Sequence, residues 1–102
     1  MNRGLITLML AFFLFSCAAA PVQQMSDARQ AIERARQIGA ETYAQESMRQ
    51  AQVFLERAQQ KLEMGSYRAA RESAELAQKR AVEAMQQARE SGSKFVNSVD
   101  LD

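Results

Sequence analysis

The sequence contains no histidine and no tryptophan, and it has only one cysteine, one proline and four glycines in 102 residues. Without histidine the chain lacks the commonest general base and the commonest metal ligand. Glu72 and Glu75 fall on neighbouring turns of a helical pattern, but no third carboxylate or Asp-rich loop completes a cation site. A glycine-rich phosphate loop is also missing. We therefore expect no enzymatic activity, no metal and no cofactor.

Neither sign of charge dominates the chain. Lys and Arg number 13 against 12 Asp and Glu, and the two signs are interspersed. No basic face large enough for nucleic acid stands out, so we expect no nucleic-acid partner. Alanine supplies much of the apolar content and buries little area, which predicts one small domain with a thin core.

The N-terminus has the three-part layout of a secretory signal peptide. Arg3 supplies a positive charge, residues 5–15 are almost entirely apolar, and small residues follow at positions 16–20. The apolar run is about eleven residues, whereas a spanning helix needs about twenty. We expect residues 1–16 to be a cleaved targeting segment and not a permanent transmembrane helix.

The end of this run, Leu14-Phe15-Ser16-Cys17, resembles the lipobox of bacterial lipoproteins. The resemblance implies cleavage before Cys17, diacylglycerol on its thiol and acylation of its new amine. More than one acyl chain anchors a protein stably in a membrane. In a Gram-negative cell, Ala18 in place of Asp implies the periplasmic face of the outer membrane; in a Gram-positive cell the anchor would lie in the cell membrane. The alternative is an ordinary signal peptide cut near Ala20.

The rest of the chain predicts an all-α fold. We expect a tether over residues 17–25, then a helix with Ser26 as its N-cap that ends at Gly39. A second helix should begin after a capping box formed by Thr42 and Gln45 and run to about Met64.

The second and third helices are expected to form an antiparallel hairpin. It should begin after a tight turn at Gly65, Ser66 and Tyr67 and end at Ser91-Gly92-Ser93, which makes residues 26–91 the helical domain. The fold is then a short helix plus a long α-hairpin, either a three-helix bundle or a hairpin like that of a tetratricopeptide repeat. An unbroken ladder of alanines at spacings of three and four predicts the helix seam. The ladder comprises Ala70, Ala74, Ala77, Ala81, Ala84 and Ala88.

Two pairs and one turn carry a family resemblance. They are Gly39-Ala40, Tyr43-Ala44 and Gly65-Ser66-Tyr67, set between alanine-rich helices. The chain resembles bacterial lipoproteins with domain of unknown function 4398, with Ser66 where Asp is usual and Gln45 where Pro is usual. The resemblance implies this architecture and an envelope location, but no activity. Some members continue into a peptidoglycan-binding domain, for which this chain has no room.

Two questions stay open at the level of sequence. Residues 92–102 are expected to be a disordered tail, with a short docking segment through Phe95, Val96 and Val99 as the alternative. The alanine ladder fits a closed monomer, favoured by the short turn at Gly65, and it also fits a homo-oligomer with helices packed between chains.

These patterns together predict a lipid-anchored periplasmic envelope protein with a structural or protein-interaction role. Its partners would be membrane lipid, through acylated Cys17, and an unidentified envelope protein. The alternative is a binding module or inhibitor for an amphipathic ligand or envelope enzyme, which needs an open groove between the first helix and the hairpin. A weaker alternative is a membrane-surface helix without packing of its own.

Overall fold

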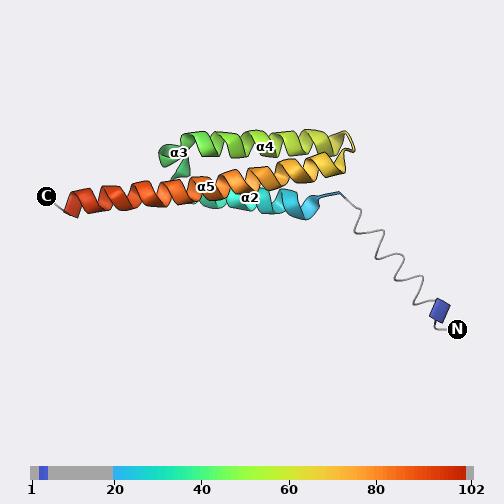
Figure 1. Cartoon of the computed structure of the whole chain (residues 1–102), viewed down its shortest axis with the longest axis horizontal. Coiled ribbons are helices and arrows are strands. Elements are labelled where there is room, and N and C mark those ends of the chain that lie inside the picture. The colour runs from blue at the N-terminus through green and yellow to red at the C-terminus, as the bar shows by residue number, and fades with distance from the viewer. Residues whose placement is uncertain (1–2, 5–19, 101–102) are drawn as a thin grey trace.

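The protein is all-α in a computed structural model that describes residues 3–4 and 20–100, with side chains described through Ser93. No strand occurs in these ranges, which confirms the expected fold class. Apart from residues 3–4, the expected signal peptide lies outside the described residues, as does Cys17. The helices are α2 (Val22–Gln37), α3 (Ala40–Tyr43), α4 (Gln45–Glu63) and α5 (Tyr67–Asp100) (Figure 1).

Helix α5 is the element on which the others pack. It lies against both α2 and α4, whereas α2 and α4 contact each other less. The short turn after α4 makes α4 and α5 antiparallel, and α2 runs in the same direction as α5 (Figure 1). The start of α2 and the α4–α5 turn therefore lie at one end of the domain, and α3 lies at the other.

The alanine ladder of α5 forms the seam between the helices. Ala70, Ala74, Ala77, Ala81 and Ala84 are fully buried, and Ala88 is 3% exposed. Side chains of α2 and α4 pack over the seam, among them Ile32, Met48 and, partly buried, Leu55. Because alanine has only a methyl group, the helix axes can approach near the lower end of the usual 8–10 Å.

The hairpin turn is a Schellman motif. The Ser66 N–H donates to the Lys61 carbonyl at 2.9 Å, and the Gly65 N–H donates to the Leu62 carbonyl at 3.0 Å. Gly65 has φ +77°, a left-handed conformation that favours glycine. Ser66 directly precedes α5, and its carbonyl accepts the Ala70 N–H at 2.9 Å.

The first helix begins five residues earlier than the sequence predicts. Pro21, not Ser26, occupies the N-cap position, so residues 22–25 of the expected tether are helical. Ser26 does not cap; its hydroxyl accepts a hydrogen bond from Gln30 Nε2 at 3.3 Å. Burial explains the extension, since Met25 is 2% exposed and packs with Ala58 and Ala74.

The expected capping box at the start of α4 is also wrong. Thr42 lies within the short helix α3, and Ala44 occupies the N-cap of α4 without any side-chain cap hydrogen bond. A backbone hydrogen bond starts α4 in place of the capping box: the Ala44 carbonyl accepts the Met48 N–H at 3.0 Å. Gly39, with φ +85°, separates α2 from α3 as the sequence indicates.

Helix α5 continues through Ser91-Gly92-Ser93, where the sequence predicts its end, to Asp100. Residues 92–100, where the sequence predicts a disordered tail, therefore belong to α5, while 101–102 lie outside the described part. Gly92 does not adopt positive φ. A glycine inside a helix costs only about 1 kcal/mol, and no proline follows Pro21 to stop propagation.

Candidate functional site

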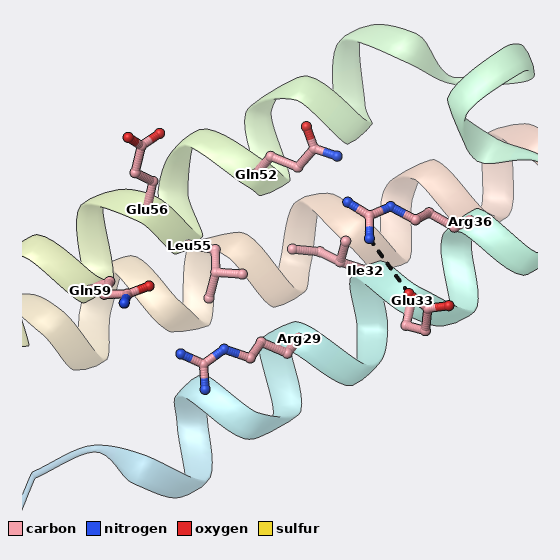
Figure 2. Close-up of a pocket in the computed structure, with 8 residues that line it drawn as sticks. All are labelled: Arg29, Ile32, Glu33, Arg36, Gln52, Leu55, Glu56 and Gln59. Carbon is pink, nitrogen blue, oxygen red and sulfur yellow. Dashed lines mark ion pairs between the residues drawn. The ribbon is translucent and has the colours of Figure 1, made fainter.

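A groove lies between α2 and α4 in the described part of the chain. Its volume is about 350 Å³. Ile32 of α2 and Leu55 of α4 form an apolar floor, and polar side chains of both helices form the rim (Figure 2). The rim consists of Arg29, Glu33, Arg36, Gln52, Glu56 and Gln59.

The groove forms because α2 and α4 both pack on the alanine seam of α5. Helices α2 and α4 pack side by side on the alanine seam of α5 but touch each other less than they touch α5. Ile32 is 3% exposed, so α2 contributes a nearly covered floor, while Leu55 remains half-buried. The apolar area open to a ligand is therefore a narrow strip along Leu55.

Some charged side chains of the rim form ion pairs, and others do not. Arg36 donates from Nε to Glu41 at 2.9 Å, and its Nη1 lies 3.5 Å from Glu33 Oε2. Arg29 and Glu56 stand on opposite sides, and neither forms a hydrogen bond or ion pair within the described residues (Figure 2). The rim can therefore offer one cation and one anion to a bound molecule without breaking a contact.

The groove places charged, amide and apolar groups next to one another. Its lining offers a guanidinium, carboxylates, amides and apolar carbons. Among the described residues, no group of three or more Cys, Asp or Glu side chains is placed to hold a metal ion. In that same part of the chain, no helix is long and apolar enough to cross a membrane.

The predicted structural positions are arranged around the seam and not around the groove. The ladder alanines lie beneath the packed helices, and Gly65, Ser66 and Tyr67 form the turn at one end. Tyr67, the first residue of α5, is 44% exposed.

Sequence reasoning missed the rim residues. Arg29, Gln52, Glu56 and Gln59 look like ordinary solvated helix positions in the sequence, because polar residues at helical spacing also occur on faces that contact only water. The one usable signal was helical position. Each rim residue lies next to the buried stripe of its own helix, so packing the two helices side by side brings the rim residues together. That pairing comes only from the fold.

An ion pair at the start of α4, away from the groove, shifts the pKa values of both its partners. Arg49 Nη2 lies close to Glu46 Oε1 at 2.6 Å, and Gln50 donates to the same carboxylate at 3.1 Å. The hydrogen bond from Arg49 lowers the pKa of Glu46, and Glu46 in turn raises the pKa of Arg49. Both side chains are exposed, so the pair organises the first turn of α4 without forming a site.

Comparison with known proteins gives one positive result. The family model described as "Domain of unknown function (DUF4398)" matches residues 23–94, which include α3, α4 and most of α2 and α5. No curated protein and no solved structure matches the chain. Because the family model spans the whole seam and the groove, the chain belongs to the family with domain of unknown function 4398.

Proposed function

We propose that the protein is a lipid-anchored envelope protein whose helical domain has a structural or protein-interaction role rather than an enzymatic one. Acyl chains on Cys17 would hold it at the periplasmic face of the outer membrane, or at the cell membrane of a Gram-positive source. The protein would have two partners: membrane lipid, and an envelope protein that contacts the exposed domain. A second copy of the chain is a further candidate partner.

The observation that supports this proposal most is the short distance in sequence between Cys17 and the packed domain. Pro21 is already buried and α2 begins at Val22, so a modified Cys17 would attach the domain to the membrane almost directly. The Leu14-Phe15-Ser16-Cys17 motif precedes this junction. A domain held so closely needs little further affinity for the membrane.

Apolar side chains on the surface of the domain support an interaction role. Eight large apolar side chains in the described ranges remain at least 38% exposed, which is a substantial share for a domain with so thin a core. Three of them lie on the hairpin helices away from the turn: Val53 on α4, and Leu76 and Val82 on α5. Such residues supply contact area for a protein partner.

The anchoring proposal is tested with Cys17→Ser in the full chain, expressed in a Gram-negative host. We expect the variant to move from the membrane fraction to the soluble periplasmic fraction. Ala19→Ser, which keeps the cysteine, is the matched control and should stay with the membrane. If Cys17→Ser remains membrane-bound after an alkaline carbonate wash, the anchoring proposal fails.

The groove favours a second candidate function, binding of a small amphipathic ligand. Its apolar floor and its unengaged Arg29 suit a molecule with an alkyl chain and an anionic head. Laurate is a direct probe. Nuclear magnetic resonance should show shifts at the Ile32 and Leu55 methyl groups on titration, weakened by Arg29→Glu. Arg34→Glu, an exposed α2 position outside the groove lining, is the control; equal effects of both substitutions would exclude the groove.

A further inference from the structure

The end of the domain that carries the α4–α5 turn is also the end at which the chain enters from its N-terminus. Figure 1 shows the start of α2 beside this turn. Packing agrees with the picture, because Met25 of α2 forms a cluster with Ala58 and Ala74, and Leu62 packs against that cluster. Ala20, the described residue that is nearest in sequence to Cys17, therefore lies at the turn end.

The length of that chain limits where Cys17 can be. Three residue steps separate Cys17 from Ala20, and a fully extended chain covers about 3.3–3.6 Å per residue, or about 10 Å in all. Helix α4 has 19 residues and at 1.5 Å per residue separates the two ends of the hairpin by about 28 Å. A lipid on Cys17 would therefore be within reach of the turn end and out of reach of the α3 end.

Three exposed apolar side chains belong to this end. Val22 is 67% exposed, Met64 70% and Tyr67 44%. We call these three residues the turn-end patch. None packs into the seam, and apolar area left in water at the tip of a domain gains free energy when a partner covers it. Tyrosine also prefers the membrane–water interface, where its ring is covered and its hydroxyl stays wet.

We propose that the turn-end patch is a lipid-contact surface, which rests at the headgroup level of the leaflet that holds Cys17. The helices then point away from the membrane, with α3 and the C-terminal end of α5 farthest from it. This inference rests on the proposed lipidation and adds to it an orientation and a set of contact residues.

Charge at the turn end indicates which lipids the contact requires. Between positions 61 and 72 there are three cations and two carboxylates, which leaves a local net charge of only +1. A single net charge gives little attraction to anionic lipid, which usually recruits clusters of basic residues. The contact is therefore apolar and interfacial, and zwitterionic phosphatidylcholine is a sufficient membrane for testing it.

The absence of tryptophan provides a direct test. Tyr67→Trp and Tyr43→Trp each introduce the only tryptophan of the chain, at opposite ends, and the parent tyrosines are 44% and 49% exposed. Each full-length variant is expressed with its signal peptide, purified with detergent and reconstituted in vesicles of phosphatidylcholine, with or without brominated acyl chains. We expect bromine to lower the tryptophan emission of the Tyr67→Trp variant about twofold and to leave that of the Tyr43→Trp variant nearly unchanged.

Two further measurements distinguish a failure of the Cys17 anchor from a failure of the lipid contact. Mass spectrometry and vesicle flotation report whether Cys17 is acylated and anchored; an unmodified, non-floating protein would overturn both the anchoring and the lipid contact. If both variants are acylated and float but their emission is equally unquenched, the lipid contact alone is overturned. Met64→Glu in the Tyr67→Trp chain should reduce quenching without affecting flotation, whereas unchanged quenching would exclude Met64 from the contact.

Discussion

At the scale of single residues, the absence of side-chain volume is what shapes this protein. The ladder alanines of α5 are buried to between 0% and 3% exposure, and large side chains of α2 and α4 lie over them. A buried alanine contributes little transfer free energy, but it allows close helix contact. Substitutions on the seam should therefore act through added volume or charge.

Ala77→Glu tests the seam directly. Ala77 is fully buried, so the substitution places an unpaired carboxylate between helices and should lower the free energy of unfolding by at least about 3 kcal/mol. Circular dichroism of the unlipidated Cys17→Ser protein should show lower helicity and a lower melting temperature together. Gln78→Glu, on the next, exposed position, should change the melting temperature little. An unchanged melt for Ala77→Glu would mean that the seam faces water.

At the scale of elements, the glycines divide into two kinds. Gly65 ends α4 with φ +77°, where an added Cβ would meet no atom within 4 Å but would be conformationally strained. Gly92 lies inside α5 without positive φ and also has open space around it. The same substitution should therefore have opposite effects at the two positions.

Gly65→Ala should destabilise the domain by about 1–2 kcal/mol, because the left-handed conformation is unfavourable for an L-residue. Gly92→Ala should stabilise it by about 0.5–1 kcal/mol, because alanine replaces glycine in a helix. Urea unfolding in the same background measures both changes. A destabilising Gly92→Ala would show that α5 ends near residue 92 after all.

At the scale of the whole molecule, α2 and the hairpin share one core. Met25 of α2 is 2% exposed and packs with Ala58 of α4 and Ala74 of α5. The seam of α5 is covered from both sides, since α2 and α4 both lie against it. The three long helices should therefore unfold together.

Met25→Ala should lower the free energy of unfolding of the entire domain by about 2–5 kcal/mol, as expected for a buried methionine. Amide hydrogen exchange should accelerate in α4 and α5 as well as in α2, with a single melting transition. Val22→Ala, at a position 67% exposed, is the matched control and should change stability little. Faster exchange confined to α2 would contradict a shared core.

The sequence by itself determined the helical class, the Gly39 and Gly65 breaks and the alanine ladder, because periodicity and left-handed glycines act over a few neighbouring residues. It misplaced the start of α2 and the end of α5. The position of a helix end depends on small differences in local free energy. The burial of Met25 outweighs them at the start of α2, and helix propagation without a stop signal outweighs them at the end of α5.

Only the tertiary structure decided that α2 runs alongside α5, that Arg29 and Glu56 face one groove, and that Val22 shares one end of the domain with Met64 and Tyr67. The residues of α2 in these groups are far along the chain from their neighbours in the hairpin. Their proximity comes from how three helices pack on one narrow seam, and no local pattern in the sequence encodes that arrangement.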